Sequence, residues 1–461
     1  MIIENIDLIR EVPGNLDLPF FQLYAPTITL TNFTCKNANT SSNSAVEIKA
    51  TTVNLENVAF GQMRSQNETV KVSGLDSTDM THFTSTQLLL DELISERYAM
   101  VVYGGGGLFY LNSTTVINTV TTEFPALAVT IYSGNVTMDY LTMKNTSNGG
   151  LRMSCIQSSI CNVSHVDMDN SRMFLFVNIS SYVRLRHVDS KNFAPAVGTS
   201  SFAFEVRLYE SSRFGARNIT AFNHTSVLGP GFFMTSNTSS GFSISDVVMT
   251  DMTTDEGGAC MHFRSSSQGS SSLTNFTCNN PVTYLLTSNN AGGGVLMNCS
   301  TIILSISQLV VQNASTTAAS ISVSSSRLTI TDSHMTLSHS AFGGGLNLLV
   351  WTSIAKISNC LFDHNRGDTF GGGILSYAFG SNTTFENITF YNNSAGSVGG
   401  GLFHNQFSYL PTDQSTISRC NFTANEAVPE SATLPRGDGM YVELAGSLSV
   451  VEITETTLMD D

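Results

Sequence analysis

The chain has 461 residues and a formal net charge of −15, with 41% hydrophobic and only 12% charged residues. No stretch of about 18 apolar residues occurs, which excludes a membrane-spanning helix. With only 21 Lys and Arg residues the chain offers no basic face for nucleic acid. Because Ser, Thr, Asn, Gly and β-branched residues outnumber helix formers, we expect a large all-β protein with a polar surface.

The first 14 residues lack the basic segment and the long apolar segment of a signal peptide. We therefore expect either a mature secreted chain or a fragment of a longer protein.

Sequons for N-glycosylation, Asn-X-Ser/Thr, occur about 18 times along the chain, roughly twice as often as random placement would give. The excess predicts a secreted, extracellular eukaryotic glycoprotein, although a chain rich in Ser, Thr and Asn also forms sequons by accident. We expect N-linked glycans on Asn32, Asn67, Asn112, Asn135, Asn162, Asn178, Asn218, Asn237, Asn275, Asn298, Asn387 and Asn421.

An internal repeat organises the chain. The octamer LTNFTCKN at residues 30–37 nearly recurs as LTNFTCNN at residues 273–280, within a looser pattern of apolar-x-apolar-x-Asn. From Asn145 to Ala424 this pattern recurs about every 28 residues, a period typical of solenoids. The alternation predicts strands with one buried face. We therefore expect one continuous domain over residues 1–461, a single-stranded parallel β-helix of about 16 coils.

The repeat pattern is lost between Gln62 and Asn145. We therefore expect irregular coils around residues 63–130. The only candidate helix, from Gln87 to Tyr98, falls in this segment.

Two columns of residues are expected where the strands turn. Asn tolerates left-handed backbone and bonds the same amide one coil away, so an Asn column is structural. His339 and His364 share this slot on adjacent coils, and replacement of Asn is favoured there over a metal pair.

The second column is glycine, which suits a turn with positive φ. Its members are residues 292–294, 343–345, 371–373 and 399–401, with 257–258 and 104–107 as candidate earlier members. No glycine run precedes Lys-Ser/Thr, which argues against a phosphate loop.

The alternation of inward and outward side chains along each strand also divides the sequons into two sets. Asn32, Asn218, Asn275, Asn387 and Asn421 are expected to face outward beside inward Phe or Ile residues. A second set is expected in the inward or turn column, with fewer glycans: Asn145, Asn223, Asn313 and Asn392.

Three segments near the C-terminus combine a Phe-x-x-Asn element with a following glycine run. They are Phe362 to Asn365 before GGGI, Phe390 to Asn393 before GGGL, and Phe422 to Asn425 before GDGM. These segments resemble the FxxN and GGA(I/L/V) repeats of the polymorphic outer-membrane proteins of chlamydiae and of similar right-handed β-helix surface proteins in eukaryotes. The match is clear over about residues 341–440 and differs in having Gly for Ala. The resemblance implies a β-helical, passenger-like domain with an adhesive role, and the sequons indicate the eukaryotic secreted branch.

The eight cysteines are compatible with secretion. Cys155 and Cys161 are close enough in sequence for a loop disulfide. Others occupy apolar strand positions and are expected to be buried thiols: Cys35, Cys278, Cys360 and Cys420.

Catalytic and metal-binding residues were sought because many β-helices cleave polysaccharides. The polygalacturonase-like motifs Asn-Thr-Asp, Asp-Asp, His-Gly and Arg-x-Lys are absent from the repeats, so no catalytic residue is assigned. One acidic cluster is a weak candidate for Ca²⁺, weighed against a solvated turn: Asp246, Asp251, Asp255 and Glu256. No other metal or cofactor is expected.

Arg-Gly-Asp occurs at residues 366–368 and 436–438. An integrin-type adhesion motif is one interpretation. We favour the other, in which the tripeptide follows from the turn that leads into the glycine column.

Together these features predict an extracellular structural glycoprotein, not an enzyme, that stacks head to tail into a filament or acts as a surface adhesin. One alternative is a polysaccharide-degrading lyase or glycoside hydrolase, which a groove lined with Asp, Arg and aromatic residues would favour. Another is a carbohydrate-binding or protein-binding module. A surface of Ser, Thr, Asn and sugar would favour the structural role.

Overall fold

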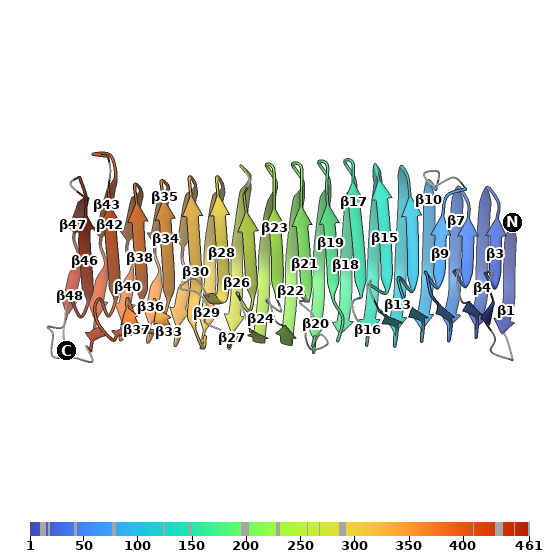
Figure 1. Ribbon diagram of the computed structural model, residues 1–461, viewed down its shortest axis with the longest axis horizontal. Coiled ribbons are helices and arrows are strands. Elements are labelled where there is room, and N and C mark those ends of the chain that lie inside the picture. Colours follow the sequence, from blue (N-terminus) through green and yellow to red (C-terminus); the bar gives the residue numbers. More distant parts are fainter. Residues whose placement is uncertain are drawn as a thin grey trace. The chain divides into compact units, whose positions relative to one another are not determined.

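The computed structural model shows an all-β chain (Figure 1). It describes residues 1–9, 15–16, 19–40, 44–75, 80–122, 125–146, 150–194, 202–226, 231–255, 257–266, 268–284, 292–408, 410–428, 437–446 and 448–459. Within these residues no helix is long and apolar enough to cross a membrane. Contacts divide the chain into unit 1 (Met1–Ala221) and unit 2 (Phe222–Asp461), which are described separately.

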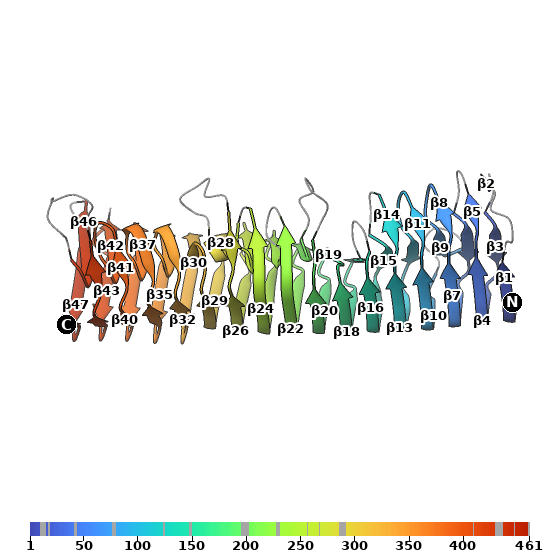
Figure 2. The ribbon, with the colours of Figure 1, turned by 90° about the horizontal axis from the view of Figure 1, so that it is seen from below.

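Unit 1 is built from parallel strands in three sheets, called A, B and C. Sheet A contains β1 (Ile2–Ile9), β4 (Thr27–Lys36), β7 (Thr52–Gly61), β10 (His82–Asp91), β13 (Gly107–Ile117), β16 (Gly134–Lys144), β18 (Ile160–Asp169) and β20 (Tyr182–Lys191). Sheet C contains β3 (Phe21–Tyr24), β6 (Val46–Lys49), β9 (Val70–Ser73), β12 (Met100–Gly104), β15 (Leu127–Tyr132), β17 (Leu151–Ile156), β19 (Met173–Val177) and β21 (Phe204–Leu208). The short sheet B, visible in Figure 2, contains β2 (Asn15–Leu16), β5 (Asn39–Thr40), β8 (Arg64–Ser65), β11 (Ile94–Ser95) and β14 (Val120–Thr121). Strand β22 (Arg213–Ser226) contains the unit boundary.

Unit 2 repeats this plan with sheets A, C and D. Its sheet A contains β24 (Gly241–Thr254), β26 (Ser270–Asn279), β27 (Val282–Thr283), β29 (Ile303–Gln312), β31 (Arg327–Thr331), β32 (His334–Thr336), β35 (Ile354–Ser358), β36 (Leu361–Asp363), β39 (Asn382–Glu386), β40 (Thr389–Tyr391), β43 (Gln414–Ser418), β44 (Asn421–Thr423), β47 (Val450–Thr454) and β48 (Thr457–Met459). Sheet C contains β23 (Phe232–Ser236), β25 (Met261–Ser265), β28 (Gly292–Ser300), β30 (Thr317–Ser324), β34 (Leu346–Trp351), β38 (Ile374–Phe379), β42 (Leu402–Phe407) and β46 (Met440–Ala445). Sheet D contains β33 (His339–Phe342), β37 (Arg366–Phe370), β41 (Ser394–Ala395) and β45 (Glu426–Ala427).

The predicted parallel β-solenoid is therefore confirmed, with one strand of sheet A, or a pair of short ones, and one strand of sheet C per coil. The coil length varies. Ile160 pairs with Tyr182, an advance of 22 residues, whereas Gln414 pairs with Val450, an advance of 36. Insertions enter at the turns, because strand positions that face the core must keep their register.

The core of each unit is formed by the alternating inward side chains. In β4 the buried residues are Ile28 and Leu30, then Phe33 and Cys35. The alternation shifts by one residue at Asn32, which has a φ of 50°. A left-handed residue inside the long strands of sheet A therefore turns the chain without loss of pairing.

Two expectations for residues 63–130 are wrong. Residues 87–98 form β10 and β11 instead of a helix, because Leu88 and Leu90 point into the core as alternate residues of a strand. The coils in this segment are also regular, since Phe83 pairs with Val53 on one side and Phe109 on the other. In these coils the turn position that Asn occupies elsewhere is held by Gln62, Glu92 and Asn118, all with positive φ. Because two of these three residues are not Asn, the repeat is hidden in the sequence.

The predicted column of left-handed Asn residues exists. In unit 2, Asn313 Nδ2 donates to Asn280 Oδ1 over 3.0 Å, and Asn280 Nδ2 donates to Asp251 Oδ1 over 2.9 Å. A second exposed column, which the repeat pattern did not predict, lies at the shift point of sheet A. In unit 1, Asn57 Nδ2 donates to Asn32 Oδ1 over 2.7 Å, and Asn32 donates onward to Asn5.

The Phe-x-x-Asn elements form buried columns. The rings of Phe390 and Phe422 stack with centroids 4.5 Å apart, and Phe362 stacks on Phe390 at 5.5 Å. Asn365 and Asn393, the last residues of these elements, are each only 1% exposed. Their side-chain amides donate hydrogen bonds to backbone carbonyls of neighbouring coils. This element therefore supplies both an aromatic stack and a buried amide ladder.

The glycine column is aligned over residues 343–345, 371–373 and 399–401. Gly343, Gly371 and Gly399 have φ values of 61°, 56° and 67°, and the amide of Gly344 donates to the carbonyl of Gly371. Residues 104–107 are not members, because they follow a strand of sheet C instead of preceding one.

The disulfides differ in part from expectation. The structure joins Cys155 to Cys161 and also joins Cys260 to Cys278, with S–S distances of 1.91 and 2.01 Å. The expectation of a free thiol at Cys278 is wrong, because Cys260, directly before β25, lies with its Cα 6.1 Å from that of Cys278, near the end of β26. The free cysteines are all buried: Cys35, Cys299, Cys360 and Cys420.

Candidate functional site

The acidic cluster proposed for Ca²⁺ is not assembled among the residues that the structure describes. Asp246 and Asp251 both lie on β24, at two different left-handed positions. Each carboxylate accepts a ladder bond of 2.9 Å, Asp246 from Asn275 and Asp251 from Asn280. Glu256 lies outside the described residues. No group of three or more His, Cys, Asp or Glu suited to a metal occurs in the described part of the chain.

His339 and His364 do not share a slot, which corrects the expected register. Phe362 pairs with Met335, so the residue opposite His364 is Leu337, and His339 instead pairs with Arg366 in sheet D. His339 Nε2 lies 2.7 Å from Asp368 Oδ1, and His364 bonds its neighbour Asp363. The error arose because Leu337, an apolar residue that is 57% exposed and occupies the left-handed turn slot, fits the pattern of a core residue.

The first Arg-Gly-Asp tripeptide lies within strand β37. Arg366 Nε is 3.4 Å from Asp368 Oδ1, so the two charges partly neutralise each other. In the second tripeptide Arg436 lies outside the described residues, and Asp438 Oδ1 accepts the backbone amide of Ala427 over 3.1 Å. The first tripeptide, held in a strand, does not resemble a protruding recognition loop.

The sequon residues do not separate by burial as expected. Asn32, Asn218, Asn275 and Asn387 are exposed and Asn421 is half-buried. The second set, Asn145, Asn223, Asn313 and Asn392, is also exposed, at left-handed turns. The second set therefore lies in the turn column, one of its two expected places, and not in the inward column, because a left-handed residue at the end of a strand points its side chain to solvent.

The remaining predicted sites fall in two groups. Asn135 and Asn237 are exposed. Half-buried side chains occur at Asn67, Asn112, Asn162, Asn178 and Asn298.

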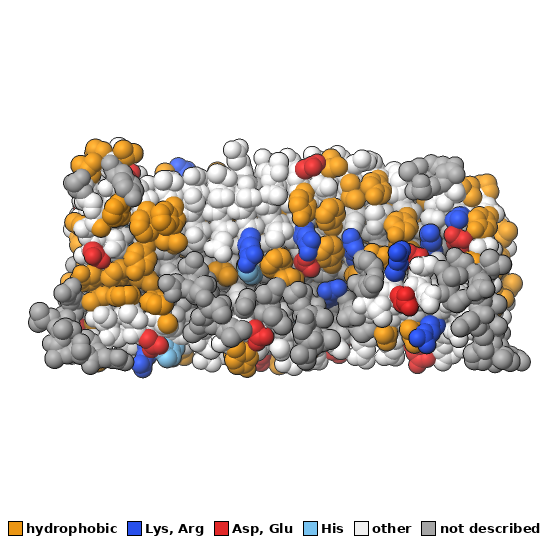
Figure 3. Space-filling view, in the orientation of Figure 1, with side chains coloured by type: hydrophobic (Ala, Val, Ile, Leu, Met, Phe, Trp, Pro, Cys, Tyr) orange, Lys and Arg blue, Asp and Glu red, His pale blue; other side chains and the backbone are white. Residues whose placement is uncertain are grey.

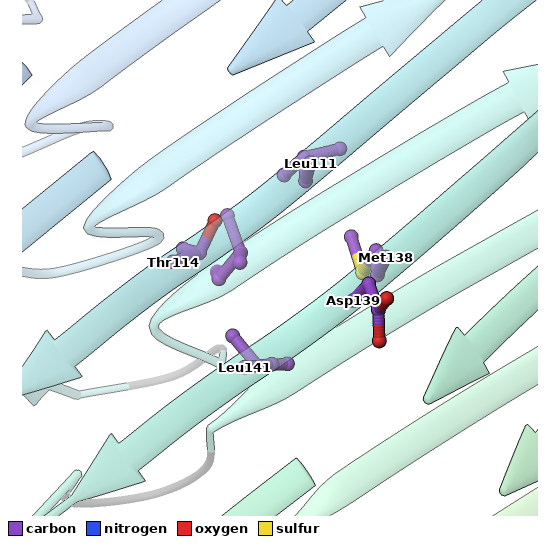
Figure 4. Close-up of a pocket in the computed structure, with 6 residues that line it drawn as sticks. Leu111, Thr114, Met138, Asp139 and Leu141 are labelled. Carbon is purple, nitrogen blue, oxygen red and sulfur yellow. The ribbon is translucent and has the colours of Figure 1, made fainter. Parts of the chain in front are cut away.

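A small cavity in unit 1 holds no ligand site. It has an empty volume of about 150 Å³ but no room for a water molecule, and is lined by Leu111, Thr114, Leu127, Met138, Asp139 and Leu141 (Figure 4). Asp139 faces outward, where its Oδ1 lies 2.6 Å from His165 Nδ1. Burial opposes ionisation of Asp139, but hydrogen bonds from His165 and Ser164 outweigh it and lower its pKa.

The most distinctive surface of unit 2 is a row of aromatic side chains on the outer face of sheet C. Register places Trp351, Phe379 and Phe407 in one column, on β34, β38 and β42. The rings of Trp351 and Phe379 stack with centroids 4.1 Å apart and planes 12° apart, and Phe407 follows at 6.2 Å. We call these three residues the aromatic row.

Further aromatic side chains lie beside the aromatic row on the same face of sheet C, with Tyr377 6.4 Å from Phe379. Phe403 is 4% exposed and packs between Tyr377 and Tyr441, with centroid distances of 5.7 and 5.4 Å. Leu375 and Val398 complete this buried cluster. Figure 3 shows the resulting gathering of hydrophobic side chains over β34, β38, β42 and β46. Patches of this kind on soluble proteins mark interaction sites.

One end of the aromatic row is open. Trp351 is 43% exposed and pairs in register with Ser324 on β30. Phe379 covers one face of the indole, so the other face is turned toward the coil of β30, which offers only small side chains. The neighbours there are uncharged and polar: Ser322 and Ser324 on β30, and Asn298 and Ser300 on β28. The hydroxyls of Ser322 and Ser324 bond no described residue, so they are available to a ligand.

The match to a family model supports the fold. Residues 268–454 match the family model described as "Right handed beta helix region". A solved structure, "Crystal Structure of the periplasmic alginate epimerase AlgG", aligns over 88% of this chain and 77% of that chain, with 10% identity and a TM-score of 0.27. No curated protein matches this chain.

Sequence reasoning missed the aromatic row. Trp351 is the only tryptophan of the chain, and Phe379 and Phe407 each lie 28 residues after the previous member. That spacing is the only available signal, because the row lies on sheet C and the repeat was read from sheet A.

Proposed function

We propose that this chain is an extracellular, N-glycosylated surface protein that binds neutral carbohydrate and has no catalytic role. It would belong to the eukaryotic adhesive branch of right-handed β-helix surface proteins. The aromatic row carries the proposal, because a stacked aromatic column ending in an open indole face is a platform for the apolar face of a sugar ring.

The chemistry beside Trp351 favours a sugar over an apolar partner. A sugar ring has one face of C–H groups and a rim of hydroxyls. The indole would stack on the C–H face of the sugar. The Ser322 and Ser324 hydroxyls and the Asn298 amide would hydrogen-bond to the hydroxyls at its rim. No charged side chain stands in register with Trp351 on β30 or β28, where Ser324 and Ser300 occupy that column. A neutral ligand therefore fits better than an ionic one.

The single tryptophan makes the test direct. The glycosylated full chain is titrated with neutral cello-, xylo-, manno- and chito-oligosaccharides while Trp351 emission is recorded. We expect a saturable change with at least one series, and no release of shorter products. Emission that stays constant with every series would contradict the binding site, and shortened products would contradict the non-catalytic role.

Head-to-tail self-association stays a separate prediction. Sedimentation velocity and electron microscopy of the native glycoprotein check it, and a particle of one chain at all concentrations would contradict it.

A further inference from the structure

The outer face of sheet C in unit 1 carries a different cluster, built on arginine. Phe174 on β19 lies between Arg152 on β17 and Arg207 on β21 in coil order. Each guanidinium carbon is 5.3 Å from the centroid of the Phe174 ring. Such cation–π contacts hold long side chains in one conformation while their N–H groups stay accessible. We call Arg152, Phe174 and Arg207 the arginine pair with its ring.

Charge gathers around this pair. Arg97 and Glu68 act electrostatically on Tyr103, as does Arg152, and Glu205 acts on Arg172. Together with Arg207, these described residues comprise four arginines against two glutamates, a net charge of +2 in a chain whose formal charge is −15. Figure 3 shows Lys and Arg side chains grouped over this part of unit 1.

The two members of the pair differ in their partners. Arg207 forms an ion pair with Glu205 at 2.6 Å, so its charge is largely compensated. Arg152 Nη1 donates to the hydroxyl of Tyr98 over 3.2 Å, and among the described residues it has no carboxylate partner. Its guanidinium is therefore positioned by Tyr98 and Phe174 but remains free to bind an anion.

We propose that this face binds an anionic polysaccharide whose charge is carried by carboxylates. The planar fork of Arg152 matches a carboxylate in bidentate geometry. Neighbouring coils are about 4.8 Å apart, which is close to the rise of one sugar in an extended polymer. A chain running across β17, β19 and β21 would therefore present one residue to each coil. Tyr98 and Tyr103 add ring surface and hydroxyls at the edge.

This inference is independent of the neutral-sugar site on unit 2. The probe is sodium polygalacturonate, with the fully methyl-esterified polymer as its uncharged form and heparin as a sulfated polyanion. Binding of each to the glycosylated full chain is measured by calorimetry at two salt concentrations. We expect polygalacturonate to bind, more weakly at higher salt, and the ester not to bind.

Variants locate the site. Arg152→Ala should weaken polygalacturonate binding by about tenfold, and Arg152→Lys should not restore it, because Lys lacks the fork. Arg184→Ala is the matched control, since Arg184 lies 4.8 Å from the Tyr182 ring on sheet A of the same unit. Trp351→Ala should also leave this binding intact.

Three results would overturn the inference: no binding of polygalacturonate, equal affinity for heparin, or wild-type affinity in Arg152→Ala. Arg207→Ala provides a second variant in case Arg152→Ala unfolds. A loss of neutral-sugar binding alone would contradict the proposed function and leave this inference standing.

Discussion

Asn365 and Asn393 lie one coil apart in the core of unit 2, with Asn365 Nδ2 donating to Asn393 Oδ1 over 3.1 Å. Asn393 Oδ1 also accepts the backbone amide of Asn365 over 3.0 Å, and Asn393 Nδ2 donates to the carbonyl of Phe362 over 2.9 Å. One buried side chain therefore satisfies two backbone groups of the neighbouring coil. Polar groups buried in this way are costly to leave unpaired.

The first prediction concerns this ladder. Asn393→Ala should lower the free energy of unfolding by roughly 3 kcal/mol, because at least two buried backbone groups lose their partner. Asn405→Ala is the control, since Asn405 is half-buried on the outer face and its side chain bonds, among the described residues, only Glu443. Urea unfolding followed by circular dichroism measures both, and equal midpoints for the two variants would refute the role of the ladder.

The second prediction concerns pH. Burial lowers the pKa of His404 to about 4 from its ordinary 6.5, and its ring nitrogens bond Ser376 and Ser415 in the neutral form. Between pH 6.5 and 4, His404 binds a proton in the unfolded chain but not in the folded chain. Stability is therefore complete above pH 6.5 and falls as the pH drops toward 4.

Urea midpoints at pH 7 and pH 4.5 check the effect of His404. His404→Gln should flatten the dependence without abolishing it, because burial also lowers the pKa of His224 to about 4. The same pH dependence in the variant and the parent protein would contradict the assignment to His404.

The third prediction concerns thiols. Two disulfides leave four thiols per chain, all buried, and burial raises the pKa of Cys35 and Cys299 to about 12. A native sample treated with iodoacetamide should therefore gain no label, because the thiol form is unreactive. After unfolding without reductant, four cysteines should be labelled. Mass spectrometry counts them, and eight labels would show that neither disulfide forms.

The fourth prediction concerns sugar placement. Asn275 Nδ2 donates to Asp246, and Asn387 Nδ2 donates to Asn359 over 2.9 Å. A sugar on either amide replaces one hydrogen and crowds the neighbouring coil. Asn135 and Asn237 are exposed, and neither donates a ladder bond to a described residue. We expect higher occupancy at Asn135 and Asn237.

Glycopeptide mapping of protein secreted from eukaryotic cells measures this occupancy. Bare Asn135 and Asn237 beside fully modified Asn275 and Asn387 would contradict the argument. Complete absence of sugar from the secreted protein would instead contradict the predicted N-glycosylation.

The sequence predicted the parallel solenoid because inward residues on sheet A repeat in nearly every coil. It failed where the turn slot is filled by a residue type that the pattern does not include, as at Glu92, and where an apolar residue occupies that slot, as at Leu337. The pairing of Cys278 with Cys260 depends on how a turn joins two sheets, which spacing alone does not determine. Outward positions of sheet C vary freely between coils, so the aromatic row and the arginine pair with its ring became visible only in three dimensions.

The central claim is that the open face of Trp351 binds a neutral sugar. Calorimetry with the oligosaccharide that most changes Trp351 emission tests it most directly, using Trp351→Ala, Trp351→Phe and the control Tyr132→Ala, an exposed aromatic residue on sheet C of unit 1. We predict that Trp351→Ala weakens binding at least about tenfold, consistent with the worth of one aromatic stacking contact. Trp351→Phe should retain most of the affinity and Tyr132→Ala all of it. Wild-type affinity in Trp351→Ala would contradict the account.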